Sequence, residues 1–372
     1  MSSSERLPGL DTLRAIAIVW VMLFHSFLMG GLGPDWSWLS RFGWMGVDLF
    51  FVLSGFLIGT QVLAPLSEGK RLSFGDFYVR RAFRILPAFC VVLMLYIFWQ
   101  AFREAEGMEP WWKFLTFTIN LNIDYLNRGA FSHAWSLCVE EHFYLLFPIL
   151  AVGLLHRPAQ WKFAALCIAL VLGAIALRAV LWRHGMDGDQ SIPRNWFVED
   201  IYYPTWNRLD GLLCGVMLAT LKTFRPQAWR NARRFANLSS FAGLCVLALA
   251  FWLFSDRTGL LANTLGWPIL SLGLGLMVFA AAGRDCLVGT LHVPLLGWLA
   301  GISYSLYLVH KGVYHVVQAH WGPLLADTGL LAVCAYGGAA ILGGAALHYT
   351  VERPFLQLRV WLKTSRDTPA LA

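Results

Sequence analysis

The amino-acid sequence predicts an all-α polytopic membrane protein. Of its 372 residues, 58% are hydrophobic and 14% are charged, and the mean hydropathy is +0.57. A soluble domain usually carries about 25% charged residues, so this composition excludes a soluble protein. Ten apolar segments are each long enough to cross a hydrocarbon core of about 30 Å. Their approximate limits are 10–29, 44–64, 84–102, 137–155, 163–182, 208–224, 238–255, 261–282, 295–317 and 329–350.

The positions of Lys and Arg predict the orientation of the chain. The net charge is +7, and the cations gather between apolar segments, which indicates a topology signal rather than nucleic-acid binding. An even number of spans places both termini on one side, and the loops on that side hold most of the cations. We therefore expect cytoplasmic termini, membrane lipid around the bundle and no nucleic-acid partner. The richest loops contain Lys70, Arg71, Arg80, Arg81 and Arg84, and Lys222, Arg225, Arg230, Arg233 and Arg234.

The first apolar segment contains an arginine and a histidine. Arg14 and His25 are 11 residues apart, which places them on one face of a helix, roughly 16 Å apart along its axis. His25 lies roughly 22 Å into the segment, beyond the middle of the bilayer. Ionisable groups at this depth usually mark a functional site, and an imidazole there can act as a general base for an acceptor arriving from outside. The alternative is a histidine bonded to a neighbouring helix, with Arg14 paired to Asp11.

A cluster of arginines precedes the third segment. Arg80 and Arg81 each lie within one helical turn of Arg84. Guanidinium groups at a membrane surface suit phosphate recognition, because the planar fork binds two oxygens at once. The alternative is a topology signal that also contacts anionic lipid.

Two glutamates open the fourth segment. Glu140 is one helical turn from Tyr144, and a carboxylate in the outer half of the membrane can orient or charge the imidazole of His25. Glu140 and Glu141 point about 100° apart, so we expect only one of them to face the interior, with Glu140 as the partner of His25. The alternative is a pair of acids at the outer membrane surface.

Other polar residues interrupt the remaining segments. They comprise an acid and a hydroxyl in the second segment, an arginine and an aspartate at the start of the sixth, and a tyrosine and a histidine in the ninth. We expect them to support the acceptor side of a site, and the alternative for each is helix packing. His310 and His315 lack the spacing of metal ligands, so no metal site is expected. The residues are Asp48, Ser54, Arg208, Asp210, Tyr304 and His310, and Lys311 follows His310 without an assigned role.

Two predicted outer loops are long, spanning about 103–136 and 183–207. The second loop mixes acids with Trp and Tyr residues between positions 187 and 206. Stacked aromatic rings and carboxylates suit a sugar. The alternative is a belt of aromatic residues at the membrane surface.

Seven motifs, taken in order, resemble those of the integral-membrane acyltransferase 3 family. They extend from residue 9 to residue 356, so the resemblance covers nearly the whole chain. We therefore interpret residues 1–372 as a single integral-membrane acyltransferase domain. The motifs are GLDTLRAIAIVWVMLFHS, GWMGVDLFFVLSGFLIG, FYVRRAFRILP, AWSLCVEEHFYLLFP, RLDGLLCGVMLA, GISYSLYLVH and VERPFL.

The resemblance implies an O-acyltransferase of the bacterial inner membrane. It implies transfer of an acyl group, usually acetyl, from cytoplasmic acyl-CoA to a hydroxyl, most often on a periplasmic or cell-surface glycan. The implied acceptor is an exopolysaccharide, an O-antigen or a lipid-linked saccharide, and polysaccharide-assembly proteins are candidate partners. A small acceptor such as a macrolide is the alternative within the family. A secondary transporter is the alternative outside it.

The resemblance also implies roles for single residues. The essential arginine and histidine of the family's first span fall on Arg14 and His25. Its basic donor motif falls on Arg81 and Arg84. Its glutamate motif falls on Glu140.

Further positions match the motifs on either side. Trp135 and Ser136 precede the glutamate, and the late histidine falls on His310. Many members have an aromatic residue and a proline shortly after that histidine, whereas Lys311 follows here and its role stays open.

The expected reaction begins with CoA phosphates held by the arginines. His25 then deprotonates the acceptor hydroxyl, which attacks the thioester. Transfer through a covalent acyl group on the protein is equally compatible with the residues. The sequence leaves open the acyl length, the modified hydroxyl and the oligomeric state.

Overall fold

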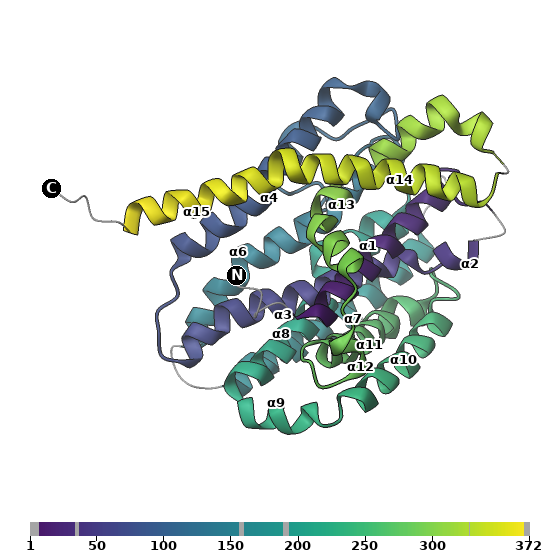
Figure 1. Ribbon diagram of the computed structural model, residues 1–372. Coiled ribbons are helices and arrows are strands. Elements are labelled where there is room, and N and C mark those ends of the chain that lie inside the picture. Colours follow the sequence, from purple (N-terminus) through teal and green to yellow (C-terminus); the bar gives the residue numbers. More distant parts are fainter. Residues whose placement is uncertain (1–6, 34–36, 156–159, 189–192, 327, 368–372) are drawn as a thin grey trace.

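The computed structural model describes residues 7–33, 37–155, 160–188, 193–326 and 328–367. Within these ranges the chain forms helices and no β-strand. The all-α prediction is therefore confirmed (Figure 1).

A helix occupies each of the ten segments predicted to cross the membrane. Eight regions are long and apolar enough to do so by length and composition. The two exceptions among the ten segments, α8 and α13, occupy the predicted sixth and ninth spans. The helices are α1 (Pro8–Leu28), α3 (Gly46–Ser67), α4 (Phe74–Phe98), α6 (Trp135–Leu155), α7 (Gln160–Asp187), α8 (Asp210–Phe224), α10 (Ala236–Leu253), α11 (Trp267–Ala281), α13 (Pro294–Leu325) and α14 (Leu330–Leu347).

The two exceptions have different physical reasons. Helix α8 has 15 residues, which rise about 22 Å and fall short of a hydrocarbon core of about 30 Å. Helix α13 has 32 residues, but its middle carries tyrosine, histidine and lysine side chains that lower its hydropathy. Much of α13 is buried among other helices, so these polar groups face protein rather than lipid.

Shorter helices connect the long ones. Three of them, η5, η7 and η8, are π-helical. Helix η8 joins α14 to α15, so that α14, η8 and α15 form one extended rod across Figure 1. The shorter helices are α2 (Ser37–Ser40), η2 (Gly43–Met45), η3 (Gln100–Phe102), α5 (Trp111–Leu115), η4 (Ser132–Ala134), η5 (Phe197–Tyr202), η6 (Thr205–Asn207), α9 (Pro226–Arg233), η7 (Ala262–Gly266), α12 (Leu287–Thr290), η8 (His348–Glu352) and α15 (Arg353–Asp367).

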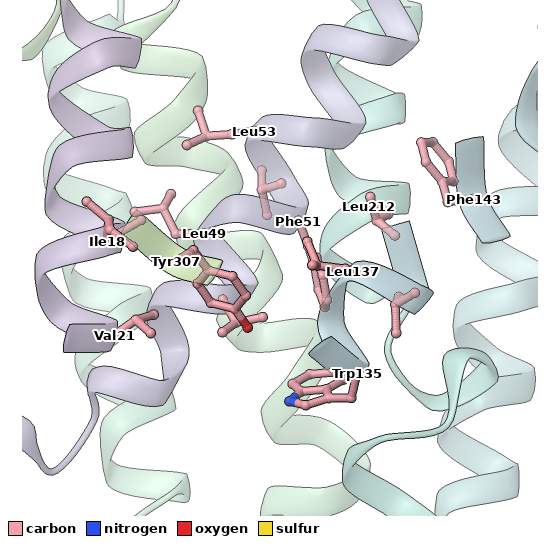
Figure 2. Packing of buried hydrophobic residues seen from close by; sticks show 14 of the residues in the cluster. Ile18, Val21, Leu49, Phe51, Leu53, Trp135, Leu137, Phe143, Leu212 and Tyr307 are labelled. Carbon is pink, nitrogen blue, oxygen red and sulfur yellow. The ribbon is translucent and has the colours of Figure 1, made fainter. Parts of the chain in front are cut away.

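The centre of the bundle is packed from residues far apart in the sequence. Figure 2 shows Ile18 of α1, Leu49 of α3, Trp135 of α6, Leu212 of α8 and Tyr307 of α13 within one buried cluster. All five belong to the same core. The core therefore fixes the relative positions of the helices that carry the candidate functional residues.

Glycines set the closest helix contacts. A Cβ added to Gly55 of α3 would overlap the carbonyl oxygen of Leu212 in α8, and one added to Gly215 would overlap that of Val52. Gly46 likewise lies against the backbone of Ala17 in α1. Small residues allow helix backbones to approach in this way. Gly46 and Gly55 therefore allow α1, α3 and α8 to pack closely.

Replacing Gly55 with valine should lower the thermal unfolding midpoint of the protein in detergent. The added side chain has no room against α8, and overpacking of this kind costs about 1–3 kcal/mol. Gly153→Ala in α6 is the matched control, because nothing lies within 4 Å of the Cβ that it would add. An equal midpoint for both variants would contradict the close approach of α3 and α8.

Candidate active site

His25, near the end of α1, contacts a second histidine. Its Nδ1 lies 2.9 Å from Nε2 of His310 in α13, and the two ring centroids are 4.8 Å apart. His310 is fully buried. The structure therefore joins two residues that are 285 positions apart and that the sequence places on separate helices.

The hydrogen bonds of this pair define which nitrogen of His25 is free. Nδ1 of His310 lies 2.7 Å from the carbonyl oxygen of Tyr307, and a carbonyl only accepts, so this nitrogen carries a proton. In the neutral ring Nε2 of His310 is then an acceptor, and Nδ1 of His25 donates to it. The lone pair of His25 is left on Nε2. A nitrogen in this state can act as a general base, because the hydrogen bond at Nδ1 holds the ring in one tautomer.

A third histidine and an ion pair adjoin the first two. The ring of His133, in η4, lies 5.1 Å from that of His310 and 6.4 Å from that of His25. Glu104 accepts from Lys311 Nζ at 2.7 Å, and its Oε1 lies 3.9 Å from His133 Nδ1. Lys311, whose role the sequence leaves open, is therefore the counter-charge of Glu104.

Glu140 lies in a different cluster from His25. Its Oε2 accepts a 2.9 Å hydrogen bond from the hydroxyl of Tyr144, which also lies 2.5 Å from Ser54 Oγ. The guanidinium of Arg81 lies over the Tyr144 ring at 5.4 Å. Ser54 and Tyr144 thus support Glu140 and the arginines instead of the histidines.

The arginines gather around this glutamate. Arg14, Arg81 and Arg84 all lie within electrostatic range of Glu140. Arg14 also pairs with Asp11 at 3.5 Å, which was one of the predicted alternatives. The cluster can therefore hold anionic groups, while the carboxylates of Glu140 and Asp11 offset part of its charge.

Arg80 and Tyr304 lie at the edge of this cluster. When the amide of Gln61 in α3 is turned to satisfy its neighbours, its oxygen accepts from Arg80 Nε at 3.0 Å. The hydroxyl of Tyr304 donates to the backbone carbonyl of Ile85 at 2.8 Å. Both contacts tie α4, which carries the donor motif, to its neighbouring helices.

The expectation that Glu140 pairs with His25 is wrong in this structure. His310 contacts His25 instead, and the ring of His133 lies near the rings of both histidines. The reason is the course of α6, which starts beside His25. Glu140 is five residues into the helix, about 7.5 Å along its axis, and so lies nearer the arginines.

Ser136 and Trp135 adjoin the histidine group without contacting His25. Ser136 Oγ lies 2.6 Å from the hydroxyl of Tyr307, which donates to the carbonyl of His133 at 2.9 Å. Trp135 stacks on Tyr203 with centroids 5.0 Å apart. The Ser136 contact holds the start of α6 against α13, and the Trp135 contact holds it against Tyr203, which follows η5.

Asp48 and Arg208 form a buried ion pair. Arg208 Nη2 donates to Asp48 Oδ1 at 2.8 Å. Its guanidinium lies 3.7 Å from the ring centroid of Trp267, 4.5 Å from that of Tyr202 and 5.2 Å from that of Trp135. This aromatic enclosure accounts for a charge in an apolar interior, and it is adjacent to the histidine group through Trp135.

Asp210 faces away from both clusters. Its carboxylate accepts two hydrogen bonds, of 2.7 and 3.2 Å, from Arg178. Arg178 is fully buried and also donates to the carbonyls of Asn207 and Asn263. Asp210 is therefore a structural residue, contrary to its expected place on the acceptor side.

The acids of the second long outer loop are paired to a cation. Arg194 bonds Glu199 at 3.1 Å and Asp200 at 2.7 Å. Burial lowers the pKa of Arg194, but the hydrogen bonds to these carboxylates outweigh that effect, so the pKa is raised. Residues 189–192 of this loop lie outside the described residues. Two of the carboxylates that the sequence offers to a sugar, those of Glu199 and Asp200, are thus engaged within the loop.

Three functional candidates escaped the sequence argument. His133 stands two residues before Trp135, just outside the quoted motif, and Glu104 is one of several acids in its loop. Lys311 was noted only as a departure from the family pattern. The feature of the sequence that could have indicated a larger polar group here is the adjacent pair of ionisable residues, His310 and Lys311. Within the described ranges, no group of three or more His, Cys, Asp or Glu residues is arranged to hold a metal ion.

Comparison with known proteins identifies the family. Residues 7–349 match the family described as Acyltransferase domain, so the chain belongs to it. The O-acetyltransferase OatA of Staphylococcus aureus (strain NCTC 8325 / PS 47) is 30% identical over 344 residues, which cover 86% of this chain and 53% of OatA. The putative peptidoglycan O-acetyltransferase YrhL of Bacillus subtilis (strain 168) is 27% identical over 327 residues, which cover 82% of this chain and 48% of YrhL.

The chain spans about half the length of the curated relatives that it matches. No solved structure matches it. The predicted membership of an acyltransferase family is confirmed, and the helices establish a multi-pass membrane protein.

Asp210→Asn should destabilise the fold. It leaves the Arg178 guanidinium buried without a counter-charge, which typically costs about 3–5 kcal/mol. The thermal unfolding midpoint in detergent measures the loss. The double variant Asp210→Asn/Arg178→Met should recover part of it, because the unpaired charge is gone. A single variant as stable as the wild type would contradict the structural role.

Proposed function

We propose that the protein transfers an acetyl group from cytoplasmic acetyl-CoA to a hydroxyl of a cell-surface glycan. The observation that carries this proposal is the His25–His310 pair, in which His310 is fully buried and His25 is partly buried. The pair leaves Nε2 of His25 free as a base in a chain of an acyltransferase family. Two relatives are named O-acetyltransferases. That family membership favours acyl transfer over the alternative of a secondary transporter.

The arginine cluster supports a donor site on the side of the termini. Arg14, Arg81 and Arg84 supply three guanidinium groups around Glu140, and phosphates are recognised by such groups. The excess of cations in the loops on that side predicts that it faces the cytoplasm of a bacterial inner membrane. Acyl-CoA is available in that compartment. Arg80 adds a further cation at the edge of the cluster.

The reaction follows from the protonation state of His25. Nε2 accepts the proton of the acceptor hydroxyl as the oxygen bonds to the thioester carbonyl carbon. The carbon–sulfur bond then breaks, and the protonated imidazole returns the same proton to the leaving thiolate. The products are an acetyl ester and CoA, with no net proton change. Transfer through an acylated protein residue remains the alternative.

His310 acts as a positioning residue in this scheme. Its Nε2 accepts a hydrogen bond from the Nδ1–H of His25, so the His25 ring is held in the productive tautomer and its charge is stabilised when its Nε2 is protonated. The hydrogen bond from His310 to the Tyr307 carbonyl fixes His310 in turn.

The proposed acceptor is a polysaccharide on the outer side of the membrane. The name of YrhL refers to peptidoglycan, which supports a glycan over a macrolide or another small molecule. Polysaccharide-assembly proteins are then the expected partners. Acylation by a longer chain would require the same residues, so acetyl rests on the names of the relatives alone.

His25→Ala should lower turnover about 10²- to 10⁴-fold, the usual contribution of a general base. The dissociation constant for acetyl-CoA should stay unchanged, because His25 acts at the acceptor end. His310→Phe should lower kcat by a smaller factor, since it removes only the hydrogen bond that orients the base. The exposed His320 provides a control, as His320→Ala. Wild-type turnover in His25→Ala would refute the assigned base.

Arg81→Ala combined with Arg84→Ala should weaken acetyl-CoA binding by roughly 10-fold or more. Hydrogen bonds to charged groups contribute about 1.5–3 kcal/mol. Calorimetry on the purified protein in detergent measures the constant. The matched control is Lys70→Ala with Arg71→Ala, which removes two exposed cations from the same loop. Equal binding by both double variants would reduce the cluster to a topology signal. Absence of binding to the folded wild type would overturn the proposed function.

A further inference from the structure

A cavity lies where α1 and α13 begin and where η8 joins α15. Its volume is about 470 Å³, within the usual range of about 300–1,000 Å³ for small-molecule sites. We refer to it as the α1–α13 cavity. Neither His25 nor the arginines around Glu140 line it, so it is a separate space from the two clusters described above. Its lining includes Asp11, His292, Trp298, His348, Tyr349 and Arg353.

Two aromatic side chains in the cavity lining are accessible. Trp298 of α13 is 36% exposed and Tyr349 of η8 is 46% exposed. Trp298 Nε1 donates to the hydroxyl of Tyr349 at 3.0 Å, which fixes the two side chains relative to each other. Aromatic side chains of this kind bind nucleic-acid bases by stacking, and every base has a face that stacks. The pair therefore offers a surface on which a base can bind.

A cation lies beside these rings. The guanidinium of Arg353 lies 5.6 Å from the centroid of the Tyr349 ring, and its side chain is exposed. Among the described residues, the one carboxylate that lines the cavity is that of Asp11, which pairs with Arg14 at 3.5 Å. The charge of Arg353 is therefore available to an anionic ligand, and a guanidinium suits a phosphate because it binds two oxygens at once.

The seventh sequence motif, VERPFL, forms this part of the cavity. Arg353 is its third residue, and Glu352, its second, is only 1% exposed. Glu352 Oε2 accepts from Ser305 Oγ at 2.7 Å and lies 2.9 Å from His348 Nδ1. The buried carboxylate thus orients the imidazole of His348, which lines the cavity. The motif presents one cation to the cavity and fixes a second polar group beside it.

The cavity adjoins the arginine cluster. Asp11 lines the cavity and pairs with Arg14, and Arg14 lies within electrostatic range of Arg84 and Glu140. Helix α1 continues from Asp11 to His25, which lies roughly 21 Å farther along its axis. A ligand that extends from the cavity to the candidate base therefore needs an aromatic, anionic end and a long, narrow arm.

We propose that the α1–α13 cavity binds the 3′-phosphoadenosine end of acyl-CoA, with adenine against Trp298 and Tyr349 and a phosphate at Arg353. The diphosphate of the same molecule then binds the arginine cluster, and its pantetheine arm follows α1 toward His25. This assignment rests on the proposed function, in which acyl-CoA is the donor. It adds the residues that distinguish CoA from an acyl pantetheine without the nucleotide.

The test measures binding of adenosine 3′,5′-bisphosphate, a nucleotide without the pantetheine arm, to the full chain in nonionic detergent. Saturation-transfer NMR gives the dissociation constant. Arg353→Ala should weaken binding about 10-fold, because it removes a hydrogen bond between charged groups, and should leave adenosine binding unchanged. Trp298→Ala should weaken binding of both probes about 10-fold, because stacking is lost. Trp298→Phe retains a ring face and should recover most of the affinity.

Two matched controls come from the same helices. Arg359→Ala removes another cation from α15, and Trp321→Ala removes an exposed ring from the far end of α13. Neither residue lines the cavity. Both variants should bind adenosine 3′,5′-bisphosphate as tightly as the wild type does.

The possible outcomes separate this inference from the proposed function. Weaker bisphosphate binding in Arg353→Ala and Trp298→Ala, with both controls unchanged, supports the nucleotide site. Equal binding by these variants and the wild type overturns it, as does a folded wild type that binds no bisphosphate. Binding that depends on Arg353 but not on Trp298 also overturns it, because a site for phosphate or a lipid headgroup explains that result.

Acetyl-CoA binding is measured in the same preparations. Equal acetyl-CoA binding by the wild type and both cavity variants overturns the inference and leaves the proposed function standing. Bisphosphate binding at the cavity without acetyl-CoA binding overturns the proposed donor and leaves a nucleotide site.

Discussion

Pairing of buried charge is the constraint on which this structure depends. A charge in an apolar interior is costly unless a partner and hydrogen bonds compensate it. Arg178 is fully buried, yet it has Asp210 and two backbone carbonyls as partners. Arg208 has Asp48 and three aromatic rings. These pairs join α7, α8 and α3 at fixed positions, so the helices that carry the reactive groups are placed by electrostatics as well as by packing.

The polar groups form two clusters with different character. Around Glu140 the arginines are in excess, and the cluster lies toward the end where the chain begins. Around His25 the groups are imidazoles, with one glutamate and one lysine that balance each other. The first environment attracts anions, and the second holds a proton acceptor. This separation along α1 suits a reaction whose two substrates approach from opposite sides of a membrane.

The sequence predicted the fold class, and the placement of Arg14 and His25 on one helix, better than it predicted the partners of these residues. The 11-residue spacing of Arg14 and His25 placed both on one helix face, and the helix α1 contains both. The partner of His25 could not be derived, because His310 is 285 residues away and its contact depends on how α1 and α13 pack. Glu140 was chosen by residue type and depth. His133 and Glu140 differ in depth by about two helical turns, and this difference decides which of them lies beside His25. Depths estimated from the sequence are less precise than two helical turns. Asp210 was misassigned because its partner, Arg178, belongs to another span.

The π-helical segments have a consequence for how such sites arise. A wider turn breaks the regular backbone pattern, and it corresponds to one extra residue within an α-helix. In η7 the carbonyl of Asn263 accepts from Arg178. In η5 the ring of Tyr202 lies against Arg208. In η8 Glu352 accepts from Ser305 and contacts His348. Each segment therefore supplies an interaction partner for a polar or charged side chain inside the bundle. Insertions and deletions of single residues, and not only substitutions, are thus a means by which evolution can create or remove interior polar contacts in a membrane helix.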